Sequence, residues 1–434
     1  MPRELDQLGR VRARRRVAHV VAELHKCDAN AMAIADLAPT QEIEELRARY
    51  RDFLDERVIP NEHRLDREDD EAQDLIRELQ GAAKADGLWA PHIGPDAGGS
   101  GQGFLTYAHL NEVIGRSVWA QLIFGCQAPD AGNAEILLMF GTEEQQERWL
   151  KPLVAGEMRS FFAMTEPDVS GADPTGLETR ALQDGDDWVI DGHKWFSSGA
   201  DGAGFGIVMA VTDPDAPPHR RMSQILVPAD TAGLEVVRAI PTMGHAGRGW
   251  ATHCEVRLTG VRVPVENTLG EPGDGFRIAQ KRLGPGRIHH VMRWLGQMQR
   301  AFELMCTRAL EREAFGSTLA EKQTVQNWIA DSAAEIQACR LLTLDTAHKI
   351  DGGDEARVEV SLIKFYAAKV LHDVIDRAIQ VHGALGLTDG TPLERMYRDA
   401  RAARIYDGPD EVHRMVVSRR ILKAFAAGDG WTFS

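Results

Sequence analysis

The chain has 434 residues, 43% of them hydrophobic, and a formal net charge of −15 at pH 7 from 50 Lys or Arg and 65 Asp or Glu. This acidity disfavours nucleic acid and anionic membranes as general partners, and no apolar run approaches the roughly 20 residues of an integral membrane segment. The five cysteines are scattered and show no metal-ligand spacing, so we expect no metal site and a reduced, cytoplasmic protein.

Residues 1–40 are expected to form an N-terminal extension, in which Arg10 to Arg16 places five arginines within seven residues. An Arg-rich start can be a transit peptide. Glu4 and Asp6 precede this run, however, and no clear cleavage site follows it. The preferred interpretation is therefore a solvated helix face.

The apolar residues of 41–159 recur at helical spacing, for example at Ile43, Leu46 and Tyr50, which predicts an N-terminal helical domain. A glycine-rich stretch, Asp96 to Gly103, interrupts this pattern. It lacks the Gly-Lys-Ser/Thr of a phosphate-binding loop, and no convincing strand leads into it, so we interpret it as a surface turn before a helix.

The pattern changes in residues 160–275 to short apolar runs broken by Gly, Pro and Asp, which predicts a middle β domain of short strands. Helical spacing returns in 276–434 and continues to the end, which predicts a C-terminal bundle of long helices. Because helices and strands do not alternate, the sequence indicates an α+β fold and argues against a Rossmann domain.

A turn signal near the C-terminus carries the candidate catalytic base. Asp407 is followed by Gly408 and Pro409 between two segments with helical spacing. Glycine tolerates unusual backbone angles and proline cannot continue a helix, so Asp407 is expected at a corner, where a carboxylate can face a cavity. On this segment alone, an ordinary turn or helix-capping Asp is the commoner interpretation.

Five motifs in chain order make the catalytic interpretation stronger. They are Phe-Phe-Ala-Met-Thr-Glu-Pro-Asp at 161–168, Lys-Trp-Phe-Ser-Ser-Gly at 194–199, Arg-Glu-Ala-Phe-Gly at 312–316 with Gln323, Gln-Val-His-Gly-Ala-Leu-Gly at 380–386, and the Asp407 segment. Together they resemble the acyl-CoA dehydrogenase family over nearly the whole chain. The motif sequences are most similar to those of a subgroup that in animals is often fused behind a phosphotransferase-like kinase domain. We do not expect such a kinase domain in this chain.

The resemblance implies an α+β acyl-CoA dehydrogenase-like fold with a C-terminal four-helix bundle, and FAD as the cofactor. It implies that an acyl-CoA thioester is oxidised to the trans-2-enoyl-CoA in fatty-acid β-oxidation. Asp407 would take the α proton, the β hydrogen would pass as hydride to flavin N5, and electrons would leave to an electron-transferring flavoprotein. The Asp407 backbone amide and a flavin ribityl hydroxyl would polarise the thioester carbonyl. The family's other base position falls at Gly286, so no second carboxylate competes.

The resemblance also assigns the FAD contacts. Around the isoalloxazine it places Phe162, Met164, Thr165, Phe196, Ser197 and Ser198, with Ser198 near N5. Phe196 stands where the family often has a stacking Trp, although an aromatic there could equally be packing. The resemblance further implies that FAD is also contacted by residues of a neighbouring subunit, and so implies a homodimer or homotetramer. These residues are Arg312, Phe315, Gln323, Gln380, Val381, Gly383 and Ala384. Pro409 and Glu411 replace residues that usually contact FAD, so backbone groups would serve there.

Four positions are implied for substrate binding, namely Ser170, Ala172, Arg287 and Gly408. Ala172 stands where the family often has a Ser that touches the CoA arm. Arg287 maps near the base and would favour its ionised form, although it could instead pair with any nearby acid. His289 and His290 follow on the same predicted helix and receive no role, because a structural His is commoner than a catalytic one.

Three alternatives remain open from the sequence. The chain could be a flavin oxidase on the same fold, like acyl-CoA oxidase or nitroalkane oxidase, the latter of which also uses an Asp base; rapid hydrogen peroxide formation would identify it. It could act on a modified acyl group, such as a 4-hydroxy or phosphorylated chain, as the kinase-fused relatives suggest. It could also be a catalytically silent assembly protein, which loss of the base or flavin motifs would mark.

Overall fold

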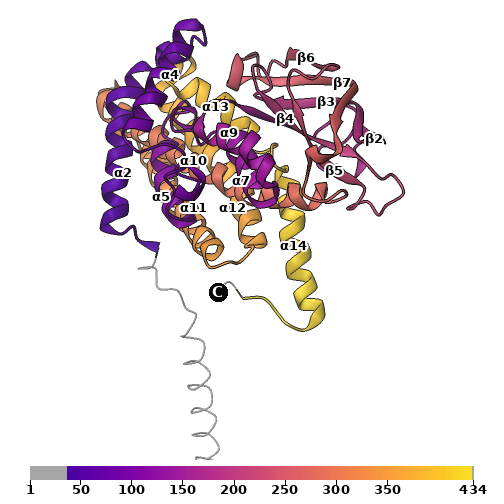
Figure 1. The fold of residues 1–434 in the computed structure, drawn as a ribbon. Coiled ribbons are helices and arrows are strands. Elements are labelled where there is room, and N and C mark those ends of the chain that lie inside the picture. Colours follow the sequence, from indigo (N-terminus) through magenta and orange to yellow (C-terminus); the bar gives the residue numbers. More distant parts are fainter. Residues whose placement is uncertain (1–36, 433–434) are drawn as a thin grey trace, which may run out of the picture. The chain divides into compact units, whose positions relative to one another are not determined.

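The computed structural model describes residues 37–432, and these fall into two compact units, residues 39–420 and residues 37–38 with 421–432. The Arg-rich run lies outside the described residues. Residues 39–420 contain helices, then a sheet, then long helices, in the order that the apolar spacing predicts (Figure 1). Within the described part of the chain, no helix is long and apolar enough to cross a membrane.

The first region is helical. The helices are α2 (Gln41–Phe53), α3 (Glu62–Leu65), α4 (Asp70–Ala85), α5 (Phe104–Ile114), α6 (Ala120–Ile123), α7 (Asp130–Phe140), α8 (Glu143–Gln145) and α9 (Lys151–Ala155). Side-chain caps fix three of their starts: the Thr40 hydroxyl accepts from the amide of Ile43, the Asp69 carboxylate from that of Ala72, and the Thr142 hydroxyl from that of Gln145.

The glycine-rich stretch forms the predicted turn before a helix. Gly99 has no room for a side chain, because a Cβ there would lie 2.0 Å from the Ile93 carbonyl oxygen. The amides of Phe104 and Leu105, at the start of α5, each donate to the Asp351 carboxylate at 2.8 Å. The Asp351 carboxylate therefore accepts from the amide groups at the start of α5 that a bound phosphate would need.

The middle region is a single sheet. The strands are β1 (Ser160–Ala163), β2 (Arg180–Asp184), β3 (Asp187–Ser198), β4 (Phe205–Val211), β5 (Met222–Pro228), β6 (Leu234–Ala239), β7 (His253–Pro264) and β8 (Thr268–Leu269). Their order is β6-β7-β3-β2-β4-β5-β8, and β1 pairs in parallel with β4. At 12 residues each, β3 and β7 are longer than the apolar runs predict, because a bulge between Lys194 and Ser197 lets β3 continue pairing.

Two apolar layers hold the sheet in place. Strands β3, β4, β5 and β7 enclose one core, which contains Phe161, Ile190 and Val256. On the other face, Leu137 of α7 and Trp149 pack with residues of β4 and β5. Burial of these side chains, worth about 1.5–3 kcal/mol for each large one, ties the first helical region to the sheet.

The third region is a bundle of long helices. Its elements are α10 (Gly275–Glu311), α11 (Gln323–Asp351), α12 (Arg357–His382), α13 (Leu393–Ala402) and α14 (Asp410–Ala427), with the short hairpin β9 (Glu313–Ala314) and β10 (Ser317–Thr318) between α10 and α11. Two glycines let α10 cross α5 closely, since a Cβ at Gly115 would lie 2.3 Å from the Arg293 carbonyl oxygen and one at Gly296 would lie 2.3 Å from that of Glu112. The backbone of α10 around residue 293 is therefore fixed against α5.

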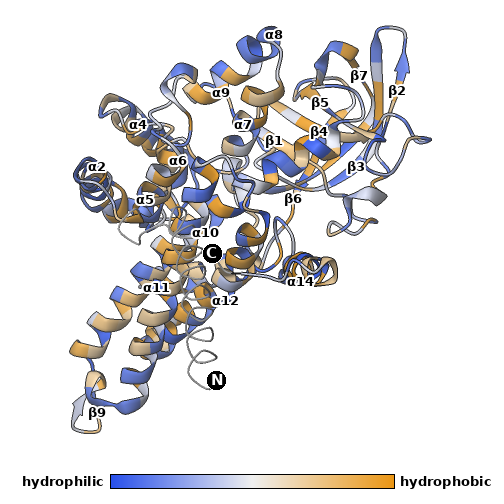
Figure 2. Ribbon diagram, turned by 90° about the horizontal axis from the view of Figure 1, so that it is seen from below, coloured by the Kyte–Doolittle hydropathy of each residue, from blue (hydrophilic) through white to orange (hydrophobic). Residues whose placement is uncertain are grey.

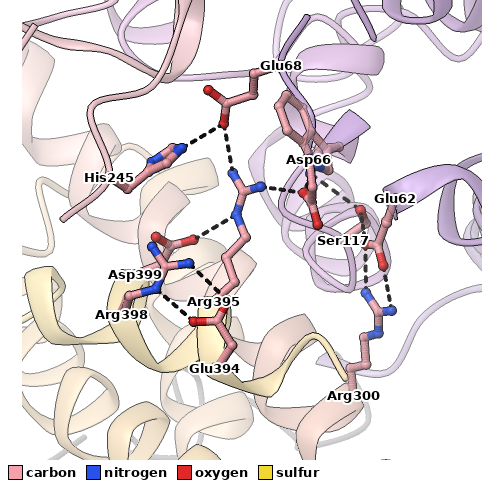
Figure 3. A network of polar contacts seen from close by, with 11 residues as sticks. Glu62, Asp66, Glu68, Ser117, His245, Arg300, Glu394, Arg395, Arg398 and Asp399 are labelled. Carbon is pink, nitrogen blue, oxygen red and sulfur yellow. Dashed lines mark hydrogen bonds and ion pairs between the residues drawn. The ribbon is translucent and has the colours of Figure 1, made fainter. Parts of the chain in front are cut away.

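A network of ion pairs joins the three regions of the 39–420 unit (Figure 3). Arg300 of α10 forms a two-point pair with Glu62 of α3 at 2.7 and 2.8 Å. Arg395 of α13 pairs with Asp66, and His245 Nε2 of the sheet region lies 3.0 Å from Glu68 Oε1. Arg300 and Arg395 each face a carboxylate, so the network stabilises the packing of helices that lie far apart in sequence.

Candidate active site

The turn between α13 and α14 holds Asp407 in the predicted corner. Asp407 has φ +52° and Gly408 has φ +101°, both in the left-handed region. Two side chains hold backbone carbonyls of this turn by three hydrogen bonds: Lys364 Nζ donates to Ala403 O at 2.6 Å and to Gly408 O at 3.3 Å, and Arg287 Nε donates to Asp407 O at 2.9 Å. Such over-determination is what keeps a strained Asp in place.

The side chain of Asp407 lies between helices and is 22% exposed. Its Oδ2 lies 2.9 Å from His290 Nε2 on α10. Burial acts to raise the pKa of this carboxyl, but the His290 interaction and the charges of Arg282 and Arg287 outweigh burial and hold the pKa well below its usual range. Asp407 is therefore ionised at neutral pH, as a proton-abstracting base must be.

Arg287 lies near the base, and its charge favours the ionised form of Asp407. Its Nε bonds to the backbone oxygen of Asp407 and not to the carboxylate, so it positions the turn and contributes charge from a short distance. Gly286 stands opposite the carboxylate, where a Cβ would lie 3.5 Å from Asp407 Oδ2. Next to the base, Gly408 leaves room for His413, whose Nε2 would lie 2.9 Å from a Cβ there.

Several residues of this cluster are absent from the sequence-based site, among them His290, Arg293 and Lys364. Arg293 Nη2 contacts His290 Nδ1, and Lys364 is fully buried beneath the turn. A helical signal was available for two of them, because Arg287, His290 and Arg293 recur every three residues and so share one face of α10. Lys364 gave no such signal, since its partners are backbone carbonyls.

The ends of β1 and β3 bring together the residues expected around the flavin. Trp195 N donates to Thr165 O at 2.9 Å, so the segment after β1 runs beside β3. Phe196 is 41% exposed and has φ +54°, and Ser198 Oγ lies 2.7 Å from His253 Nδ1. Ser197, by contrast, is fully buried, side chain and backbone alike.

A buried ion pair holds this edge rigid. Lys194 Nζ lies 2.8 Å from Glu166 Oε1 and donates to Met164 O at 3.0 Å. Glu166 also accepts from the amides of Glu178 and Thr179, so the pair has hydrogen bonds beyond its own contact. A strained, exposed aromatic at the bulged end of a strand is a surface that a planar ring would cover, so these residues fit an isoalloxazine.

Arg282 connects the β1 edge with the base. Its guanidinium lies 4.1 Å from the centre of the Phe162 ring, and its Nε donates to Asn133 at 3.0 Å. Its charge also acts on Asp407. Two motifs that are 245 residues apart in sequence, at Phe162 and Asp407, therefore share one buried neighbour.

The residues expected to reach a second FAD lie away from this cluster. Arg312, Phe315 and Gln323 lie in or beside the β9–β10 hairpin, which Figure 2 shows at the far end of the bundle from the sheet. Phe315 is completely exposed. At the end of α12, Gln380, Gly383 and Ala384 are exposed, whereas Val381 is buried. The hairpin is therefore too far from the sheet to contact a flavin held at the ends of β1 and β3 of the same chain.

The remaining predicted positions lie on exposed or capping segments. Ser170 and Ala172 are exposed on the loop after β1, where the Gly171 between them lies against Thr165, as a Cβ there would lie 3.2 Å from Thr165 Cγ2. This loop is therefore next to the proposed flavin edge. Pro409 and Glu411 stand at the start of α14, and Glu411 is exposed.

Comparison with known proteins identifies the family of the chain. The chain matches the N-terminal domain of acyl-CoA dehydrogenases over residues 40–157, the middle domain over 161–261 and the C-terminal domain over 273–422. It is 47% identical over 399 residues to "Probable acyl-CoA dehydrogenase FadE2" of Mycobacterium tuberculosis, with 89% of this chain and 97% of that protein covered.

Two further proteins extend the comparison. Acyl-CoA dehydrogenase family member 11 of Rattus norvegicus is 41% identical over 394 residues, which cover 88% of this chain and 50% of that protein. The chain thus spans about half the length of this animal relative. A solved structure of a "putative acyl-CoA dehydrogenase" from Mycobacterium abscessus has a TM-score of 0.85 and 41% identity, with 89% of this chain and 100% of that chain covered.

Proposed function

This chain belongs to the acyl-CoA dehydrogenase family and is an enzyme of that class, and from that premise we propose that it oxidises an acyl-CoA thioester to the trans-2-enoyl-CoA with FAD. The observation that carries the proposal is the Asp407 site. It combines an ionised, largely buried carboxylate with an arginine, Arg282, that also contacts the edge expected to hold the flavin. A base on one side of the substrate and a hydride acceptor on the other is what α,β-dehydrogenation requires.

Asp407 supplies the first chemical step. Its carboxylate takes the α proton of the thioester, and the negative charge that develops on the thioester oxygen needs hydrogen-bond donors. Among residues 37–432 the Asp407 amide N–H has no hydrogen-bond acceptor. This amide is therefore available to the thioester carbonyl, and the left-handed turn presents it on the same residue as the base.

Bound FAD would supply the acceptor for the β hydrogen, which leaves as hydride. Phe162, Met164, Thr165, Phe196 and Ser198 would hold the flavin ring. We further propose that the exposed residues Arg312, Phe315 and Gln323 complete the cofactor site of a neighbouring copy, so that the enzyme works as a homodimer or homotetramer, and that an electron-transferring flavoprotein reoxidises it. The exposure of Phe315 supports this, since a large apolar side chain at a hairpin tip suits an interface.

Anaerobic mixing of the FAD-loaded enzyme with a panel of acyl-CoAs tests the proposal. We expect a thioester of one chain-length class to bleach the flavin absorbance, and the D407N variant to retain FAD without bleaching. A nitroalkane that bleaches the flavin when no thioester does would contradict the proposal and favour an oxidase. Rapid hydrogen peroxide formation in air, with bleaching by a thioester, would make the enzyme an acyl-CoA oxidase.

A second candidate is an enzyme whose acyl substrate carries a polar substituent. Both ring nitrogens of His92 and Oε2 of Glu135 are buried without a hydrogen-bond partner among the described residues. The His92 ring lies 5.9 Å from that of Tyr107, which lies 5.0 Å from His289, the neighbour of His290 in sequence. Burial raises the pKa of Glu135 to about 8, against the charge of Arg282, so this carboxyl can donate a hydrogen bond.

Unpartnered polar groups beside an acyl site favour substrates that can bond to them. Straight-chain and 4-hydroxy acyl-CoAs of equal length separate the two candidates. A kcat/KM at least 10-fold higher for the hydroxylated thioester favours the second candidate, and H92F should then remove the difference. Equal kcat/KM values for the two thioesters favour the first candidate, an enzyme for unsubstituted acyl-CoAs.

A further inference from the structure

His290 lies between a cation and the base. Its Nε2 is 2.9 Å from Asp407 Oδ2, and its Nδ1 is in hydrogen-bond contact with Arg293 Nη2. The three residues come from one face of α10 and from the turn before α14, and the His290 side chain is only 14% exposed. The contacts on its two nitrogens determine where its proton lies.

A guanidinium can only donate hydrogen bonds, so Nδ1 of His290 must accept. The ring proton is then on Nε2, from which it is donated to the carboxylate. Burial chiefly, and then the charge of Arg293, lower the pKa of His290 to about 4, against the opposing effect of Asp407. The imidazole is therefore neutral and has one fixed tautomer at physiological pH.

We propose that His290 is the positioning residue of the base: it holds Oδ2 of Asp407 by a hydrogen bond whose direction Arg293 fixes, and it leaves Oδ1 free for the α proton. This inference rests on the proposed function, in which Asp407 is the base. It also means that His290 does not relay the proton, because its Nδ1 is occupied by a donor. The abstracted proton then stays on Asp407 until the product leaves.

Arg293 is arranged for this purpose. Within the described residues no carboxylate lies within 4.0 Å of its guanidinium, and its other side-chain acceptor is Gln121 Oε1 at 3.5 Å. Gln121 is in turn held by Asn111, at 2.9 Å. The contact of Gly115 with the Arg293 backbone fixes its place along α10. Its positive charge therefore acts on the base through His290 and not through an ion pair.

Other charged or titratable groups face Asp407 but do not replace this bond. They are Arg282 and Arg287 from α10, Lys364 from α12, Tyr406 from the turn and His413 from α14. In the part of the chain that the structure describes, His290 is the only residue that donates to the Asp407 carboxylate. Removal of the His290 ring should therefore leave the charged groups around Asp407 in place and free its Oδ2 from this hydrogen bond.

Two substitutions separate positioning from structure. H290L removes the donor, whereas H290Q can still donate to Asp407 and accept from Arg293. We expect H290L to lower the rate of anaerobic flavin reduction about 10- to 100-fold, the range for a lost hydrogen bond to a charged group. We also expect it to move the acid limb of the pH profile upward, because ionised Asp407 loses its donor. H290Q should stay within about 5-fold of the wild type.

H372L is the matched control, since His372 lies on α12 with its ring 4.7 Å from Tyr397, away from Asp407. It should leave the acid limb unchanged. An H290L profile with the wild-type acid limb, or an H290Q variant as slow as H290L, would overturn the inference.

A spectroscopic test does not depend on turnover or on the folding of H290L. Solid-state NMR of the 15N-histidine-labelled holoenzyme, with the H290Q spectrum subtracted, reports the two nitrogens of His290. We expect a protonated Nε2 and an unprotonated Nδ1, and a shifted Nδ1 signal in R293M. A protonated Nδ1 overturns the inference whatever the activity. An active D407N variant would instead contradict the proposed function, so the two failures are distinguishable.

Discussion

Arg293 and Arg300 lie seven residues apart on α10, and their surroundings differ in one respect. Arg300 meets Glu62 in a two-point pair, within a network where Arg395 and His245 also face carboxylates (Figure 3). Within the described part of the chain, the side-chain acceptors of Arg293 are two neutral groups, His290 and Gln121. Where the charge serves packing it is neutralised directly by a carboxylate, whereas the Arg293 charge has no carboxylate partner among the described residues and acts on His290, whose pKa it lowers. On this one helix, Arg300 therefore contributes to stability and Arg293 to the site around the base.

The largest expected effect comes from removal of the base itself. In D407N the chemical step should slow by about 10²- to 10⁴-fold, the usual contribution of a general base. Anaerobic stopped-flow of flavin reduction measures this step. The thermal midpoint should not fall, because Asn keeps the shape of a residue whose turn is held through backbone carbonyls.

D66N is the control for the network, since Asp66 pairs with Arg395 and Trp119 far from the base. It should retain the rate of flavin reduction and lower the thermal midpoint. If D407N kept activity within about 10-fold, or if D66N slowed the chemistry as much, the separation would be wrong.

The next effect is on stability. R300M leaves Glu62, 14% exposed, without its cation although the Ser117 hydroxyl still donates to it, so the free energy of unfolding should fall by about 1–3 kcal/mol, as for other buried charged groups that lose a partner. Urea denaturation measures this, and the rate of flavin reduction should not change. A double-mutant cycle with E62Q should show that the two losses do not add; independent losses would mean that the pair contributes nothing.

The smallest effect is a pH dependence from Lys364. Burial chiefly lowers the pKa of Lys364 to about 8, against the charges of Asp407 and Asp410. Between this value and the ordinary 10.5, the unfolded chain binds a proton that the folded chain does not, so stability from this group rises with pH. At about 1.4 kcal/mol per pKa unit, the wild type should gain on the order of 2 kcal/mol over K364M from about pH 7 to 9.5. Parallel pH curves for the two proteins would contradict this.

The sequence by itself determined the order of the regions and the family. Helical spacing, then short apolar runs, then helical spacing again predicted the three regions, because these periods reflect which faces are buried. The five motifs predicted the family, which the comparisons confirm. The Gly-Pro pair placed Asp407 in its corner, because the backbone angles of that turn are a local property.

Only the tertiary structure decided what surrounds Asp407. His290 is 117 residues away in sequence and received no role from it, although it is the residue that contacts the carboxylate. Lys364 and Arg282 reach the site from other turns and helices. The long β3 likewise depends on pairing with β7 across a bulge. Such contacts depend on how α10, α12 and the sheet pack, and no local pattern carries that information.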